Sequence, residues 1–182
     1  MDIQTVYQET IKYAAEKHGE INQKIPGTDI TYVVHLSNVA MEILIASFHS
    51  ENFNLYFAIQ VALLHDILED TKTSFHDLQN KFGNQVSSAV QALTKNDYLK
   101  DKSHKMEDSL QRIKLQPKEV WSVKLADRIT NLQTPPKHWS EEKIKAYCFE
   151  AEQILLGLKN ANPFLEKRLE LKIVEYRKLY VS

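Results

Sequence analysis

The segment ALLHDILEDT, residues 62–71, places one imidazole and three carboxylates in a run that is otherwise mostly apolar. If this segment is one helix, each residue is rotated by about 100° around the helix axis from the one before it. Measured from His65, the angular positions are about 40° for Glu69, about 100° for Asp66 and about 140° for Asp70. The four polar groups then share one side, opposite an apolar side. A solvated surface helix has the same pattern, so the remaining sequence must decide between solvent exposure and a site that binds metal or moves protons.

Composition narrows the class of protein. The chain has 182 residues, 43% of them hydrophobic and 26% charged, with a net charge of −1. This length predicts one domain with a proper core. A charge near zero gives no indication of a nucleic-acid or membrane partner, although a local basic patch could still bind a phosphorylated small molecule. No segment resembles a signal peptide or a membrane span, and we expect a cytoplasmic protein.

Helical periodicity runs through almost the whole chain, whereas strand-type alternation is absent from the sequence. With only four glycines and five prolines, the pattern predicts an all-α bundle. The expected helices are 3–18, 32–48, 55–70, 75–82, 84–93, 109–115, 118–132, 140–159 and 163–180. The polar stretch 94–109 is expected to be a mobile or ligand-covering loop, or else a plain solvated connector.

Two further polar residues stand inside apolar helical segments. His35 could be an ordinary hydrogen-bonded core histidine. Asp127 has Leu125, Ala126 and Ile129 near it, so its carboxylate must be paired or metal-bound; Lys124 or Arg128 could provide the pairing. Because Cys148 is the only cysteine, the sequence excludes an internal disulfide and a multi-cysteine metal site, and any metal would need imidazole and carboxylate ligands.

The order His35, then His65-Asp66, then Asp127 resembles the H…HD…D pattern of the HD-domain superfamily of metal-dependent phosphohydrolases. Five motifs around these residues are together more specific: HGEINQK, YVVH, ALLHDILEDT, FG and VKLADRITNL. Together they are similar to the hydrolase domain of the RelA/SpoT family, and in particular to its stand-alone small alarmone hydrolases, which include the metazoan SpoT homologues. The resemblance runs from about residue 5 to residue 175, and it implies a single HD domain over residues 1–182.

The resemblance also implies roles for individual residues. His35, His65, Asp66 and Asp127 match the metal ligands, and the metal of the family is usually manganese, although another divalent ion could serve. Glu69 and Asp70 match the catalytic pair that handles the proton of the attacking water or of the leaving group. The substrate-binding positions of the family match Lys24, Tyr32, Asn131, Thr134, Lys143 and Tyr147.

The implied activity is a manganese-dependent (p)ppGpp 3′-pyrophosphohydrolase that hydrolyses guanosine 3′,5′-bis(diphosphate) to GDP and pyrophosphate. Gln23 stands where the family usually has an arginine that stacks on the purine, so base preference stays open. The alternatives are a phosphohydrolase of another nucleotide (ppApp, NADPH or a nucleoside monophosphate) and a non-catalytic alarmone-binding module. The expected partner is a small nucleotide, with no nucleic acid and no membrane; the sequence leaves the oligomeric state open.

Overall fold

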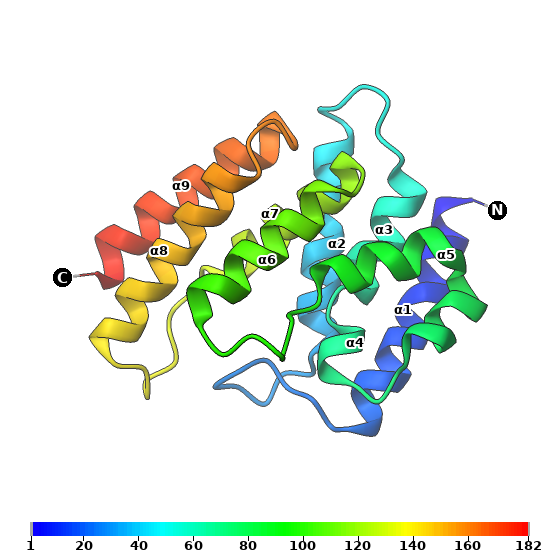
Figure 1. Ribbon diagram of the computed structural model, residues 1–182, viewed down its shortest axis with the longest axis horizontal. Helices are drawn as coiled ribbons and strands as arrows, with labels where there is room; N and C mark the ends of the chain where they lie inside the picture. The colour runs from blue at the N-terminus through cyan, green and yellow to red at the C-terminus, as the bar shows by residue number, and fades with distance from the viewer. Residues whose placement is uncertain (1, 182) are drawn as a thin grey trace.

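A computed structural model describes residues 2–181, apart from the side chain of Lys102, and within this range the chain is helical (Figure 1). The only pairing of strand type in the described residues is an isolated antiparallel bridge between Lys24 and Thr31. The expected all-α class is therefore confirmed. The helices are α1 (Ile3–Glu20), α2 (Val33–Ser47), α3 (Leu55–Leu64), α4 (Ile67–Asp70), α5 (Phe75–Leu93), α6 (Lys102–Lys114), α7 (Lys118–Asn131), α8 (Glu141–Gly157) and α9 (Pro163–Tyr180).

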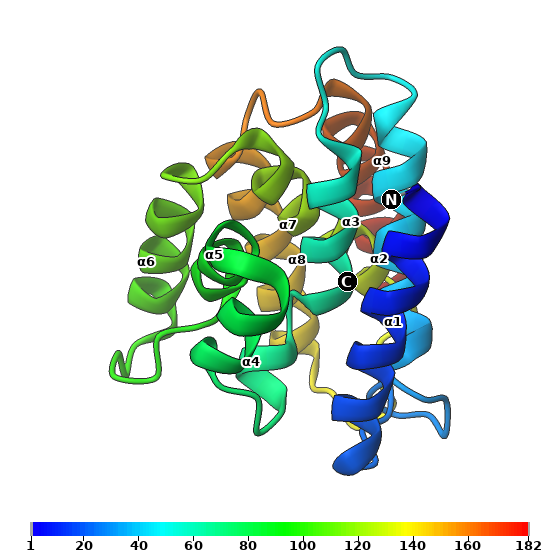
Figure 2. The same ribbon diagram turned by 90° about the vertical axis from the view of Figure 1, so that its right-hand side faces the viewer.

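The centre of the bundle is formed by α2, α3 and α7, which pack against one another. On one side α1 covers α3, and on the other side α8 and α9 form an antiparallel pair against α7 (Figures 1 and 2). Helices α5 and α6 pack together and close the third side. None of the helices among residues 2–181 is long and apolar enough to cross a membrane.

A continuous apolar core holds these helices together. In α3 every residue from Phe57 to Leu64 is buried except Gln60, and Leu36 and Ile43 of α2 are completely buried against it. Burying a side chain of this size stabilises the fold by roughly 1.5–3 kcal/mol. The central position of α2, α3 and α7 follows from this apolar content, and it brings their few polar residues into the interior.

Local signals place several helix ends where the sequence predicts them. Ser140 accepts a hydrogen bond from the Lys143 amide and starts α8, and Asn162 caps α9 with Pro163 as its first residue. In α5 the backbone of Gly83 has φ +82°, and this kink separates the two segments predicted as 75–82 and 84–93.

Two expectations about helices are wrong. Residues 62–71 are not one helix: α3 ends at Leu64, His65 and Asp66 form a turn, and the hydrogen bonds resume in the short α4. The polar stretch 94–109 is also not a loop throughout. The Asp101 side chain accepts hydrogen bonds from the amides of Ser103 and His104, so this N-cap starts α6 seven residues before the predicted start.

Candidate active site

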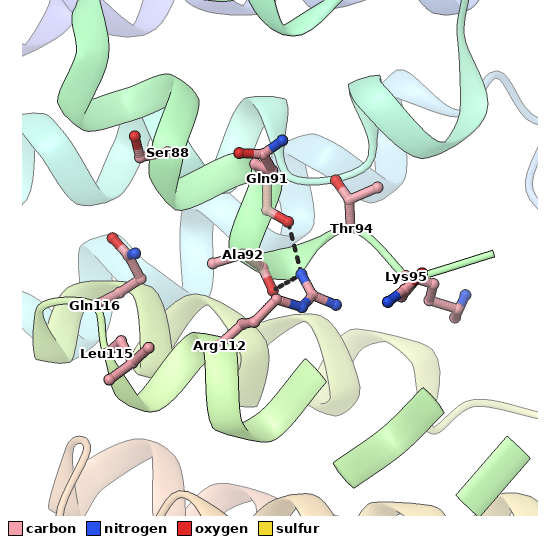
Figure 3. A pocket seen from close by; sticks show the side chains of 9 residues that line it. Ser88, Gln91, Ala92, Thr94, Lys95, Arg112, Leu115 and Gln116 are labelled. Carbon is pink, nitrogen blue, oxygen red and sulfur yellow. Dashed lines mark hydrogen bonds between the residues drawn. The ribbon is translucent and has the colours of Figure 1, made fainter. Parts of the chain in front are cut away.

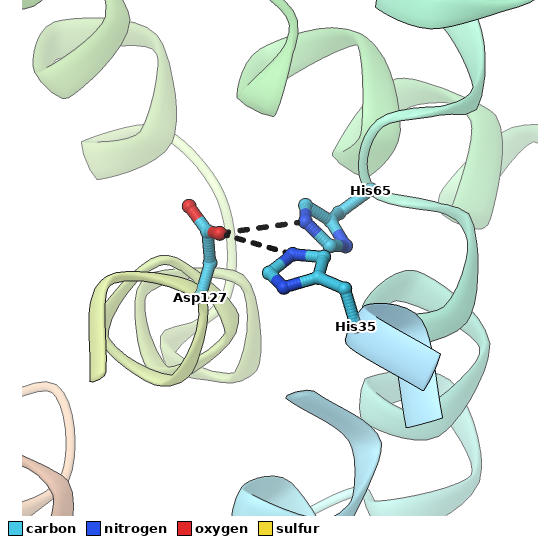
Figure 4. Close-up of side chains that lie close together, drawn as sticks. All are labelled: His35, His65 and Asp127. Atoms are coloured by element: carbon cyan, nitrogen blue, oxygen red, sulfur yellow. Dashed lines mark ion pairs between the residues drawn. The ribbon is translucent and has the colours of Figure 1, made fainter. Parts of the chain in front are cut away.

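Three buried side chains, from α2, from the turn after α3 and from α7, converge inside the bundle (Figure 4). His35 comes from α2, His65 follows the last residue of α3, and Asp127 comes from α7. The Nε2 atoms of His35 and His65 lie 3.4 Å and 3.6 Å from Oδ1 of Asp127. One ligand atom from each of the three residues lies within 4.8 Å of the other two. The pattern of polar residues inside apolar helices therefore produces one compact cluster.

The hydrogen bonding of His65 suits a metal ligand. Its Nδ1 lies 2.8 Å from the carbonyl oxygen of Ala62, so the proton belongs on Nδ1 and the lone pair of Nε2 points into the cluster. The Nε2 atoms of both His65 and His35 are buried and lack a well-formed hydrogen bond. Buried lone pairs that face carboxylate oxygens repel them unless a cation or a proton lies between. The donor set of two imidazoles and a carboxylate thus fits a divalent cation.

Asp66, the fourth predicted ligand, lies at the edge of this cluster. Its Oδ2 is 2.9 Å from Nε2 of His65 and 4.0 Å from Nε2 of His35. The hydroxyl of Tyr32 donates a hydrogen bond to the same oxygen. Asp66 is not one of the three residues whose ligand atoms all lie within 4.8 Å, but it is close enough to supply a further oxygen.

Asp127 is held by polar neighbours on its own helix. Nζ of Lys124 donates to Oδ2 at 3.2 Å, and the amide of Asn131 donates to Oδ1 at 2.5 Å. The pairing with Lys124 that the sequence left open is therefore present, while Arg128 is directed to Glu150 at 3.5 Å. The two oxygens of Asp127 divide their contacts, one toward lysine and one toward the histidines.

The charges of the cluster are strongly coupled. Burial acts to lower the pKa of His65, but the carboxylates of Asp66 and Asp127 outweigh it and hold that pKa well above its usual value. Burial acts to raise the pKa of Asp127, but Lys124 and the two histidines outweigh it and keep that pKa well below its usual range. In the absence of a metal, the cluster therefore keeps its carboxylates ionised and attracts a proton as the positive charge.

Glu69 and Asp70 of α4 lie beside the cluster, and each is fixed by a contact from another element. Lys95 donates to Glu69 through both its backbone amide, at 3.1 Å, and its Nζ, at 2.5 Å. The amide of Gln23 donates to Oδ2 of Asp70 at 2.7 Å, and its oxygen lies 2.5 Å from Nδ1 of the buried His18. Burial raises the pKa of Asp70 despite the hydrogen bond from Gln23. One carboxylate is thus paired with a cation, while the other accepts a hydrogen bond from a neutral amide.

A cavity of about 350 Å³ connects these groups, a volume suited to a small molecule. Among the predicted residues, it is lined by Tyr32, His65, Asp66, Glu69, Asp70, Asp127, Asn131 and Tyr147. His35 belongs to the cluster but does not line this cavity. Burial raises the pKa of Tyr147 to about 12, so its hydroxyl is a neutral hydrogen-bonding group there.

Three predicted substrate contacts lie outside the cavity lining. Lys24 is in the loop after α1, where its backbone bridges Thr31. Thr134 follows α7 and hydrogen-bonds Tyr180 of α9 at 2.9 Å. Nζ of Lys143 lies over the ring of Trp139, 4.3 Å from its centroid. Contact with these residues requires a ligand that extends beyond the cavity.

The sequence reasoning missed two groups that line the cavity. Lys95 is one of several lysines in the polar stretch 94–109, and nothing in the sequence distinguishes Glu150 of α8. Arg128 was considered only as a partner for Asp127. A buried arginine within an apolar helix is rare unless it has an anionic partner, and this signal could have identified Arg128.

A second hollow, of about 430 Å³, lies between α5 and α6 (Figure 3). Arg112 reaches across it and donates to the carbonyl oxygens of Gln91 and Ala92 at 2.8 Å and 2.9 Å. These are carbonyls of the last turn of α5, where a cation compensates the helix dipole. Arg112 therefore has a structural explanation, and the hollow does not include the histidine cluster.

Comparison with known proteins agrees with this geometry. Residues 10–163 match the family model described as an HD domain. A guanosine-3′,5′-bis(diphosphate) 3′-pyrophosphohydrolase MESH1 of Danio rerio is 36% identical over 179 residues, which covers 93% of each chain. A guanosine-3′,5′-bis(diphosphate) 3′-pyrophosphohydrolase of Aquifex aeolicus is 32% identical over 177 residues, covering 95% of this chain and 24% of that protein. A solved metazoan orthologue of SpoT, described as hydrolysing ppGpp, superposes with a TM-score of 0.75 at 28% identity over 95% of this chain and 94% of the other.

Proposed function

This chain belongs to the HD domain family, and we propose that it is a (p)ppGpp 3′-pyrophosphohydrolase. The relatives that it resembles in sequence are named as enzymes of this activity. The substrate is guanosine 3′,5′-bis(diphosphate) or its pentaphosphate analogue, and the products are GDP or GTP and pyrophosphate. The observation that carries this proposal is the cavity in which His65 and Asp127 adjoin Glu69 and Asp70. A metal cluster and a proton-handling pair in one cavity are what phosphate-ester hydrolysis needs.

His35, His65 and Asp127 would hold the divalent ion, with Asp66 as a further ligand. We propose manganese, because imidazole and carboxylate ligands without a thiolate suit it; another divalent ion could take its place. When bound, the ion supplies positive charge that polarises a phosphoryl oxygen and lowers the pKa of water.

Glu69 and Asp70 would manage the protons of the reaction. Water attacks the phosphorus attached to the 3′-oxygen, a new oxygen–phosphorus bond forms, and the bond from that phosphorus to the 3′-oxygen breaks. One proton leaves the attacking water, and one is delivered to the departing 3′-oxygen. Burial raises the pKa of the Asp70 carboxyl, and Glu69 is held in place by its ion pair with Lys95.

Tyr32, Asn131 and Tyr147 line the cavity and would contact the nucleotide. Lys24, Thr134 and Lys143 lie outside it, and we propose that they meet the parts of a long substrate that project from the cavity. A nucleotide with diphosphates on both the 3′ and the 5′ oxygens has such parts. Lys143 is a cation for a distant phosphate.

A second candidate is the same chemistry on another nucleotide: ppApp, NADPH or a nucleoside monophosphate. The observation in its favour is the placement of Gln23, whose amide is engaged by His18 and Asp70. A neutral amide held in this way offers a base neither the stacking plane nor the paired donors of an arginine. The catalytic groups would be unchanged, and only the choice of base would differ.

We further propose that residues 1–182 act as one HD domain on a small nucleotide in the cytoplasm. The continuous core that runs from α1 to α9 supports a single domain. Cys148 is a buried free thiol, which is ordinary for a protein of a reducing compartment.

The test is product analysis after incubation of the purified protein with manganese and, in separate reactions, ppGpp, ppApp, NADPH and AMP. Release of pyrophosphate from ppGpp supports the proposed activity, and faster turnover of another substrate moves it to the second candidate. The Glu69→Gln variant is the matched control, since it keeps the shape of the side chain and removes its charge. If wild type and variant turn over none of the four yet both bind ppGpp, the protein is a binding module and the proposal fails.

A further inference from the structure

Another cavity, of about 390 Å³ and distinct from the hollow of Figure 3, adjoins the cavity next to the histidine cluster. We call it the basic annex. It is lined by Lys95, Lys100, Lys105, Met106, Ser109, Lys124, Arg128 and Glu150. Four of these residues, Lys95, Lys124, Arg128 and Glu150, also line the first cavity, so the two spaces share a wall. The lining carries five cationic side chains and one carboxylate, although the whole chain has a net charge of −1.

Arg128 gives independent evidence that the basic annex is incomplete without a ligand. The residue is only 7% exposed, and its Nε and Nη1 are buried without a hydrogen-bond partner. Its contact with Glu150, at 3.5 Å, is at the long limit of a hydrogen bond. One face of the guanidinium lies over the ring of Tyr147, 4.3 Å from its centroid. Buried donors without partners are costly, and an anion that accepts from them removes that cost.

The cations of the basic annex come from the α5–α6 loop, from α6 and from α7. Lys100 and Lys105 belong to the α5–α6 loop and to α6, whereas Lys124 and Arg128 belong to α7. Lys124 is partly neutralised by Asp127, and Lys105 by the exposed Asp97 at 3.3 Å. Lys100 has no carboxylate within 4.0 Å among the ion pairs of residues 2–181. An anion with two charged centres could contact α6 and α7 at once, which a single small anion could not do equally well.

We propose that the basic annex binds a diphosphate group. This inference deepens the proposed function and rests on it for the source of that group. The source is either the 3′-diphosphate, which leaves as pyrophosphate, or the 5′-diphosphate of the nucleotide. Arg128 anchors the group on the shared wall, and Lys100 and Lys105 cover it from the side of α6. The shared wall places the group next to the cluster that carries out the reaction.

The test is calorimetric titration of the full-length protein with inorganic pyrophosphate after removal of metal with a chelator. Removing the metal prevents pyrophosphate from binding through an ion held by the histidine cluster. The variants are Lys100→Ala and Lys105→Ala, and the matched control is Lys114→Ala, at an exposed lysine of α6 outside the basic annex. We expect each annex variant to raise the Kd for pyrophosphate about fivefold at low salt and the control to leave it unchanged.

Parallel titrations with GDP and GMP identify the source of the diphosphate. Binding of pyrophosphate but not of GDP, with loss in the Lys105→Ala variant, assigns the basic annex to the 3′-diphosphate. Binding of GDP much tighter than GMP, with the same dependence on Lys105, assigns it to the 5′-diphosphate. Equal Kd values for wild type and both annex variants, or an equal loss in Lys114→Ala, overturn the proposal.

These titrations use neither metal nor turnover, so they separate this inference from the proposed function. Pyrophosphate binding that depends on Lys100 and Lys105, in a protein that does not hydrolyse ppGpp, would preserve the basic annex and refute the activity. Hydrolysis of ppGpp with no lysine-dependent binding of pyrophosphate or GDP would preserve the activity and refute the basic annex.

Discussion

Replacing Asp127 by Asn tests the metal cluster most directly, because the side chain keeps its shape and loses its charge. Oδ1 of Asp127 lies 3.4 Å and 3.6 Å from the two histidine nitrogens. Changing a group that only supports a metal ligand commonly weakens metal binding about 10- to 100-fold, so we assign the loss of a ligand the upper value, about 100-fold. Manganese at 100 times its Kd stabilises a protein by about 2.7 kcal/mol. At the same concentration the Asp127→Asn variant would gain only about 0.4 kcal/mol.

Thermal denaturation with and without manganese measures these stabilisation free energies as shifts in Tm. In a domain of this size, 1 kcal/mol shifts Tm by about 2–4 °C, so manganese should raise the Tm of the wild type by about 5–11 °C and that of Asp127→Asn by about 1 °C. Metal content after gel filtration gives a second measurement. Asp29→Asn, at an exposed loop position, is the control and should behave as the wild type. Unchanged metal content and an unchanged Tm rise in Asp127→Asn would show that this carboxylate has only a structural role beside Lys124.

Four further predictions concern the same site. Glu69→Gln should lower kcat about 10²- to 10⁴-fold while keeping the manganese-induced rise in Tm; loss of that rise would place Glu69 among the metal ligands. Burial acts to lower the pKa of His65, but the carboxylates of Asp66 and Asp127 outweigh it and hold that pKa well above 6.5. Manganese binding at pH 7 should therefore release about one proton. Calorimetry in buffers of different ionisation enthalpy would measure this release. The same raised pKa stabilises the metal-free fold below about pH 6.5, and this stabilisation is lost as the pH rises through the pKa of folded His65; a flat profile of metal-free stability against pH would contradict it. Gln23→Arg should raise the ratio of kcat/KM for ppGpp over ppApp about tenfold, since arginine can pair with guanine acceptors; no change in this ratio would show that position 23 does not read the base.

The individual residues differ in how well the sequence could place them. Asp127 is buried beside Lys124, as its apolar surroundings predict, because an ionised carboxylate in a core needs a partner. His35 alone was indistinguishable from a core histidine, and its meeting with His65 and Asp127 depends on how α2, α3 and α7 pack. The catalytic and substrate-binding roles of these residues remain predictions.

Thr134 and Lys143 show the opposite case. A match to a motif assigns both residues to a nucleotide site, but it does not specify where their side chains lie in the folded protein. Their side chains contact Tyr180 and Trp139, respectively. Lys95 and Glu150 carry no motif and nevertheless line the cavity, because the loop after α5 and the helix α8 fold over α7.

The sequence by itself determined the helical class and most of the helix ends, because hydrogen bonds and caps within a helix join residues at most a few positions apart. The same locality explains the failure at residues 62–71. His65 and Asp66 keep near-helical backbone angles, with φ/ψ of −56°/−32° and −101°/−1°. The turn therefore barely changes which side each residue faces, and the helical spacing of apolar and polar residues continues through it. Only the tertiary structure decided that helices distant in the chain bring the histidine cluster together, and that Lys100 and Lys105 share a cavity with Arg128 of α7, whose Nε and Nη1 lack a hydrogen-bond partner. These arrangements arise from the packing of apolar faces, which the order of residues along one helix does not specify.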